Sequence, residues 1–280
     1  MPNPEQTPDA VAPLRGAPHI AARFAQARAA RRAVFMPYLV VGHPDLETFT
    51  QLVIELERAG AAVFELGIPF SDPLADGPVI QAATQQVLAQ GINVAACLAA
   101  VRTLRDRGVQ AALTFMSYVN PLLTYGLPRF CADAAAVGLD GLIVPDLPPE
   151  ESDELAAACR DQGLALIRFL APTSTPARVE RVTRDAEGFI YLVSLTGVTG
   201  IRDRLPPELE AFVGRVRART AAPLAVGFGI SNADQAQTVA RLADGVIVGT
   251  AIVKRAGGEN PVAAVGALGR ELVAACDKGV

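Results

Sequence analysis

Aromatic side chains are scarce in this chain, which has no tryptophan and only four tyrosines in 280 residues. Proteins that hold single-stranded nucleic acid stack its bases on such side chains. The formal net charge of −4 also differs from the basic excess that a nucleic-acid-binding surface needs. The composition therefore excludes nucleic acid as an expected partner.

Residues that ligate metals are few and scattered. The two histidines, His19 and His43, have no Cys or His nearby, and no two cysteines form a CxxC pair. Isolated cysteines in apolar segments are more often buried, reduced thiols than zinc ligands or disulfide partners. We therefore expect no metal site, and buried free thiols at Cys97, Cys131, Cys159 and Cys276.

Lysine occurs only at Lys254 and Lys278. An enzyme that forms a Schiff base needs its lysine inside the active site, and both of these lysines follow the last expected strand. Covalent amine catalysis is therefore excluded.

Long apolar runs are absent as well. No segment approaches the ~18 consecutive apolar residues of a membrane span, and the N-terminal segment has no apolar signal-peptide core. Its arginines could suggest a transit peptide, but Glu5 and Asp9 argue against one. We expect a cytoplasmic protein with no membrane contact.

Apolar runs of strand length alternate with segments in which apolar residues have helical spacing. The runs are near-continuously apolar, as in parallel strands that are covered on both faces. Strands are expected over residues 35–41, 62–66, 111–116, 141–144, 164–170, 189–193, 224–227 and 245–248. Helices are expected over residues 46–59, 79–90, 94–107, 128–136, 153–160, 176–185, 207–219, 233–240 and 262–275.

This alternation predicts an α/β fold, a (β/α)8 TIM barrel of parallel strands. An open, doubly wound sheet is the alternative, but eight evenly spaced units favour closure. We expect residues 19–280 to form one barrel domain with an extra N-terminal helix over residues 20–31. A flexible extension over residues 1–18 is expected to precede it.

The most informative segment runs from Glu65 to Pro78, across the end of the second strand and into the following loop. Glutamate is depleted in strands and costly to bury without a partner. A glutamate at the end of this strand, Glu65, therefore indicates a specific role. Asp76 lies on the same loop and can return to the same pocket. Because the loops after the strands form the active face of such a barrel, the two acids are candidates for acid/base catalysis. The alternative for an isolated acid is a structural cap on nearby loop N–H groups.

Three other loops have weaker signals. His43, after the first strand, is expected to be an exposed loop histidine, and Asp146, which follows a proline, to be a turn former. The long, polar segment over residues 194–204 suits either a mobile lid over the substrate or a disordered surface loop.

Glycines follow the seventh and eighth strands, in Gly227-Phe228-Gly229 and in Gly249-Thr250. Backbone N–H groups exposed by glycine before a helix bind anions without a basic side chain. Barrels of this kind often build a phosphate site from these two loops. Tight-turn glycines are the alternative interpretation.

Together these segments resemble the α subunits of tryptophan synthase. The resemblance covers residues 35–275 and rests on residues 65–78, 191–200, 227–231 and 244–253. It implies reversible retro-aldol cleavage of indole-3-glycerol phosphate to indole and glyceraldehyde 3-phosphate, in tryptophan biosynthesis. Two departures are His43, where the family often has Asp, and Thr250, where it often has Ser.

The resemblance also implies roles for individual residues. Glu65 matches the principal acid/base, and Asp76 matches the residue that holds the indole N–H. The implied substrate-binding set comprises Phe35 and Tyr118 at the indole, Tyr191 in the pocket, Phe228 in the seventh loop, and Gly200, Gly229, Gly249 and Thr250 around the phosphate.

The same family implies a partner and a cofactor arrangement. The chain is expected to bind no cofactor itself and to form an α2β2 heterotetramer with a β subunit that carries pyridoxal phosphate and receives the indole. Two other functions remain open at this stage. One is a phosphosugar isomerase on the same barrel, and the other is a regulatory barrel subunit without catalysis.

Overall fold

The computed structural model describes residues 14–193, 208–227 and 229–279, and these form a closed barrel of parallel strands. The strands pair in chain order and β8 closes on β1, so the predicted TIM barrel is confirmed. Each strand begins and ends within about one residue of its expected bounds. The strands are β1 (Val34–Val40), β2 (Val63–Gly67), β3 (Ala112–Met116), β4 (Gly141–Ile143), β5 (Ala165–Leu170), β6 (Ile190–Val193), β7 (Leu224–Gly227) and β8 (Gly245–Val248).

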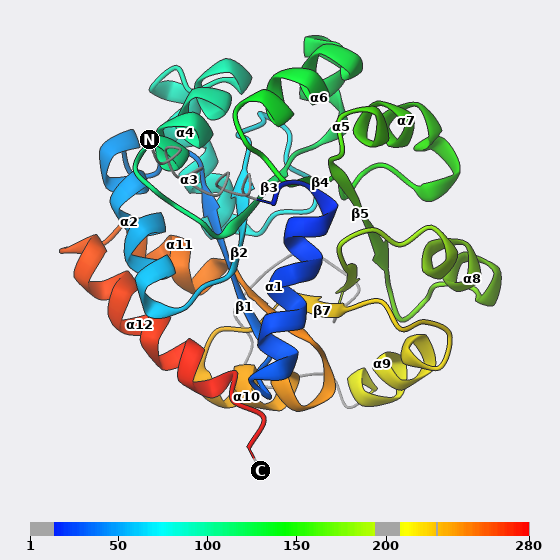
Figure 1. The fold of residues 1–280 in the computed structure, drawn as a ribbon. Coiled ribbons are helices and arrows are strands. Elements are labelled where there is room, and N and C mark those ends of the chain that lie inside the picture. The colour runs from blue at the N-terminus through cyan, green and yellow to red at the C-terminus, as the bar shows by residue number, and fades with distance from the viewer. Residues whose placement is uncertain (1–13, 194–207, 228, 280) are drawn as a thin grey trace, which may run out of the picture.

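Helices surround the barrel (Figure 1). The expected ones are present as α1 (Ala17–Ala29), α2 (Leu46–Ala59), α3 (Pro78–Ala89), α4 (Val94–Asp106), α6 (Leu127–Ala136), α7 (Asp153–Asp161), α8 (Pro176–Arg184), α9 (Leu209–Arg217), α10 (Ala233–Leu242) and α12 (Pro261–Ala275). The sequence did not predict α5 (Val119–Tyr125), α11 (Thr250–Ala256) or the single 3₁₀ turn η1 (Pro149–Glu151). These segments have too few turns to show a helical period.

The helix α1 lies across one end of the barrel (Figure 1). Its Ile20 and Phe24 pack among interior residues of the strands, such as Val34 and Ala165, and so close that end. The helix begins at Ala17, three residues before the expected start at residue 20.

Asp140 attaches α1 to the barrel. Its carboxylate is fully buried and accepts hydrogen bonds from the backbone N–H groups of Gly16 and Leu113, each at 2.8 Å. The Arg105 guanidinium donates at 2.7 Å, and His19 Nδ1 lies 2.9 Å away. Because these partners come from separate segments, one charged group joins the N-terminal helix to the strand ends.

Side chains alternate between the inside and the outside of the barrel along each strand. On β1, Val34 and Met36 face the interior, where they meet Val63 of β2. Phe35 instead packs in the outer layer, between the strands and the helices. This alternation decides which side chains can reach the space enclosed by the strands.

The four cysteines are buried, as expected. Cys131 and Cys159 lie with their sulfur atoms 3.9 Å apart, in hydrogen-bonding contact rather than bonded to each other. Within the described ranges no single helix is long and apolar enough to cross a membrane; only α3 and α4 taken together, bent by 98°, have the length and composition.

Candidate active site

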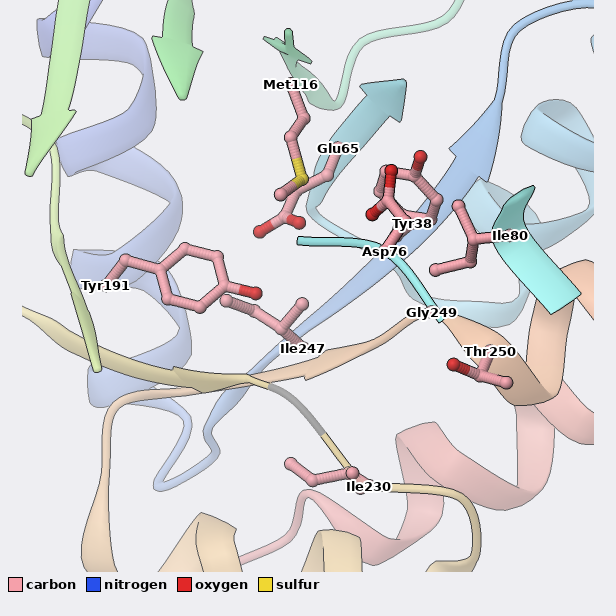
Figure 2. Close-up of a pocket in the computed structure, with 11 residues that line it drawn as sticks. Tyr38, Glu65, Asp76, Ile80, Met116, Tyr191, Ile230, Ile247, Gly249 and Thr250 are labelled. Carbon is pink, nitrogen blue, oxygen red and sulfur yellow. The ribbon is translucent and has the colours of Figure 1, made fainter. Parts of the chain in front are cut away.

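A cavity opens at the carboxyl ends of the strands, opposite the end that α1 closes. Figure 2 shows side chains from several strands and loops extending into it. The cavity is lined by Tyr38, Glu65, Asp76, Ile80, Met116, Tyr191, Gly229, Ile230, Ile247, Gly249 and Thr250. The two acids singled out in the sequence therefore face one space, together with residues of both glycine-containing loops.

Glu65 is the most deeply buried acid of this cavity. It faces the barrel interior from β2 and is 1% exposed. Its Oε1 atom has no hydrogen-bond partner among the described residues. Burial without a compensating partner raises its pKa to about 8, because the charged form loses its hydration. The carboxyl group is therefore protonated at neutral pH and available to a substrate.

Asp76 is held by its own loop and by the loop after β3. The Tyr118 hydroxyl lies 3.3 Å from Asp76 Oδ2 and donates to it, while accepting from the Ala75 N–H at 2.8 Å. The Gln81 side-chain amide donates to the Asp76 carbonyl at 2.8 Å. Burial raises the pKa of Asp76 to about 6, and the Tyr118 hydrogen bond opposes that rise. At neutral pH Asp76 is thus ionised while Glu65 is neutral.

Backbone groups form the other end of the cavity. Gly249 directly follows β8, and Thr250 begins α11. Gly229 lines the same cavity and is in the left-handed region, at φ +92°, which glycine adopts without strain. Glycine-containing loops that precede a helix bind anions through backbone N–H groups, so these residues are candidates for an anion-binding site.

Two tyrosines extend into the barrel interior beside the acids, and the hydroxyl of each lies against a glycine. The Tyr38 hydroxyl lies over Gly67 at the end of β2, and the Tyr191 hydroxyl lies over Gly227 at the end of β7. A Cβ atom at either glycine would overlap the tyrosine ring. The two glycines thus leave the room that the rings need beside the acids.

Phe35 requires a correction, because it does not reach this cavity. Its side chain packs in the outer layer and borders a separate hollow near the opposite strand ends, beside Gly60 and Ala62. The cavity position on β1 belongs to Tyr38, three residues later and on the inner face. Strand alternation alone could have separated the two, since residues 34, 36 and 38 share one face.

His43 is also corrected, since it is buried rather than exposed. Its ring packs against the end of α11 near Gly257, and Nδ1 has no hydrogen-bond partner among the described residues. Burial lowers its pKa. Asp146 accepts from the Val119 N–H at 3.0 Å and so joins two loops, which is a structural role.

Of the remaining residues predicted for the site, some are described by the structure and others are not. Tyr118 borders an adjoining hollow with Tyr38 and Asp76, so it contacts the site through its hydroxyl. Gly200, Phe228 and the expected lid over residues 194–204 lie outside the described residues. Within the described ranges no group of His, Cys, Asp and Glu is arranged to hold a metal ion.

The cavity is narrow, with a volume of about 30 Å³. Met116, Ile80 and Ile230 give it an apolar lining beside the two acids.

Comparisons with known proteins identify the family. A family model for the tryptophan synthase alpha chain matches residues 24–271. The tryptophan synthase alpha chain of Roseiflexus castenholzii is 54% identical, over 84% of this chain and 90% of its own length. That of Chloroflexus aurantiacus is 52% identical, over 91% and 97%.

The fold comparison gives the same family. A chain in a structure of Mycobacterium tuberculosis tryptophan synthase superposes with a TM-score of 0.86 at 38% identity, covering 93% of this chain and 98% of that one. With a family match over most of its length and relatives at half identity or more, the chain belongs to the tryptophan synthase alpha chain family.

Proposed function

We propose that Glu65 and Asp76 carry out the lyase reaction of this family, the reversible cleavage of indole-3-glycerol phosphate to indole and glyceraldehyde 3-phosphate. One observation carries the proposal. Two buried acids with pKa values near 8 and 6 face one cavity, so one is neutral and the other charged at neutral pH. When two acids have pKa values separated in this way, the neutral one can donate a proton and the ionised one can stabilise positive charge.

The first step uses the neutral form of Glu65. Its proton goes to C3 of the indole ring, which turns the ring into an electron sink and leaves Glu65 as a carboxylate. That carboxylate then takes the proton of the hydroxyl on the adjacent carbon. The bond between this carbon and C3 breaks, its electrons return to the ring, and an aldehyde forms. Glu65 ends the cycle protonated, as it began, so no external acid or base is needed.

Asp76 acts at the ring nitrogen. When C3 is protonated, positive charge develops on the ring and its N–H becomes more acidic. The ionised Asp76 carboxylate accepts that N–H and stabilises the charge, an interaction that is stronger in the transition state than in the ground state. The Tyr118 hydroxyl fixes the orientation of this carboxylate.

The phosphate group is assigned to the glycine-containing loops. Gly229, Gly249 and Thr250 offer backbone N–H groups and a hydroxyl at the end of the cavity away from Glu65. Gly200 and Phe228 are proposed to complete this end, on the basis of the family resemblance. Substrate held at both ends presents the scissile bond to Glu65.

We also propose the family's assembly for this chain. The β subunit, with its pyridoxal phosphate, would receive the indole within an α2β2 heterotetramer in the cytoplasm. Exposed apolar residues near the active end, Leu74 on the loop after β2 and Leu123 on α5, suit contact with a partner. The isomerase and regulatory alternatives gain no support, because the relatives are tryptophan synthase alpha chains.

The test is release of indole from indole-3-glycerol phosphate, with and without a β subunit. The substitution Glu65→Gln should lower kcat by about 10²–10⁴-fold and leave KM nearly unchanged, since it removes the proton but preserves the shape. Glu151→Gln, at an exposed position, is the matched control and should match the wild type. Near-normal turnover of the Glu65→Gln enzyme would refute the assignment. Added β subunit should raise turnover, and an unchanged rate would contradict the proposed assembly.

A further inference from the structure

Tyr38 lies between the two ends of the proposed substrate site. On adjacent strands it pairs in register with Glu65, and both side chains face the cavity. Its ring lies against Gly249, where a Cβ atom would approach ring atoms to 3.4 Å. Figure 2 shows Tyr38 between Glu65 and Gly249. The residue thus borders the path from the catalytic acid to the anion-binding loops.

The Tyr38 hydroxyl is a neutral donor that the protein leaves unused. Among the described residues it makes no hydrogen bond, although it lies over Gly67 and within the field of Asp76 and Glu65. Burial, and then these two carboxyl groups, raise its pKa well above 10. It therefore keeps its proton throughout the range in which the acids titrate. A hydroxyl that borders a cavity without a partner among the described residues is available to donate to a ligand.

The substrate offers a suitable group at this position. Between the reacting carbon and the phosphate-bearing carbon, the three-carbon chain carries a second hydroxyl, which takes no part in bond cleavage. A substrate that spans from Glu65 to Gly249 brings this middle hydroxyl alongside Tyr38. The reacting hydroxyl is already assigned to Glu65.

We propose that Tyr38 determines specificity for the hydroxylated chain by donating a hydrogen bond to the middle hydroxyl of indole-3-glycerol phosphate. This inference rests on the proposed function and adds a role that the catalytic acids do not supply. A site built to bond a hydroxyl rejects a substrate that lacks it, because the buried polar group is then left unpaired. Apolar lining from Ile80, Ile230 and Ile247 offers the chain no such discrimination.

The test compares two substrates that can both be cleaved. One is indole-3-glycerol phosphate, and the other is its analogue without the middle hydroxyl, which keeps the reacting hydroxyl, the ring and the phosphate. The wild type should favour the first in kcat/KM by about 10–100-fold, equivalent to about 1–3 kcal/mol at 1.4 kcal/mol per tenfold. The Tyr38→Phe variant should lose that preference by slowing on the first substrate only.

Tyr125→Phe is the matched control, since it removes a hydroxyl that donates to Asp133 on the molecular surface. Its substrate preference should equal that of the wild type. If Tyr38→Phe lowers kcat/KM equally on both substrates, Tyr38 has only a packing role and the inference is overturned. A wild-type preference below about threefold overturns it without any variant. If the wild type cleaves neither substrate, the proposed function itself fails, which is a separate result.

Discussion

The ring of Tyr38 occupies the space that a Cβ atom on Gly67 would need. Such an atom would lie 2.8 Å from the Tyr38 Cζ atom and 3.0 Å from Cε2. The absence of a side chain at Gly67 therefore sets where the Tyr38 hydroxyl lies relative to Glu65, two residues before Gly67 on β2. A glycine that takes no part in the chemistry thus controls the geometry of the site.

We predict that Gly67→Ala lowers kcat/KM for indole release by about tenfold or more, because the Tyr38 ring must turn into the cavity. Overpacking of the interior should also lower the free energy of unfolding by about 1–3 kcal/mol. Steady-state kinetics and urea denaturation measure the two effects.

Gly214→Ala is the control for this change. Gly214 lies within the helix α9, is exposed, and has no atom within 4 Å of an added Cβ. Its replacement should leave activity unchanged and raise stability by about 0.5–1 kcal/mol through helix propensity. An active Gly67→Ala enzyme would mean that the Tyr38 position is irrelevant to catalysis.

The pH dependence of the reaction should have two limbs. Asp76 must be ionised to hold the ring N–H, so activity should fall as pH drops through about 6. Glu65 must be protonated to act on C3, so activity should fall as pH rises through about 8. In the Asp76→Asn variant the rate should be lower at every pH, and the acidic limb should disappear while the basic limb remains. Profiles of kcat/KM from about pH 5 to about pH 9 measure this.

A retained limb near pH 6 in the Asp76→Asn enzyme would assign that titration to another group. Asp146 is the neighbouring candidate, since burial raises its pKa too. The substitution Asp146→Asn should leave both limbs in place, because its carboxylate binds the Val119 N–H and is absent from the cavity lining.

Much of this arrangement could be predicted from residue pattern. The strands are apolar on both faces, so their bounds were predictable to within about one residue, and the carboxylates at Glu65 and Asp76 could be assigned to one loop. The prediction for Phe35 was wrong because strand alternation turns its side chain to the outer layer and assigns Tyr38 to the inner face. His43 could not be predicted as buried, since its cover comes from α11, a helix distant in sequence and too short to show a period.

Glu65 should also reduce the stability of the fold at high pH. Its pKa is about 8 in the folded chain and about 4.3 when unfolded, so between these values the native state binds more protons than the unfolded state. Stability therefore falls as pH rises through this window and levels off above about 8.

Glu65→Gln removes this titration. The variant should equal the wild type near pH 5 and exceed it by a few kcal/mol, on the order of 2–4, near pH 9. Urea denaturation at about pH 5, 7 and 9 measures the difference. Glu151→Gln, at an exposed position, should show no such trend. A difference that does not change with pH would mean that Glu65 titrates alike in the folded and unfolded chain.

The buried carboxylate of Asp140 should contribute more to stability than any surface ion pair of this chain. Asp140→Asn keeps the shape but removes the charge, so Arg105 loses its buried partner and Gly16 and Leu113 compete for one acceptor. The free energy of unfolding should fall by about 3–5 kcal/mol. The control is Glu47→Gln, which weakens the exposed pair with Arg107 and should leave the free energy of unfolding nearly unchanged. Because Asp140 bonds Gly16 and His19 at the start of α1, limited proteolysis should also cut the variant earlier within residues 14–29 than elsewhere. Equal losses in the two variants would mean that α1 is held by the apolar contacts of Ile20 and Phe24 alone.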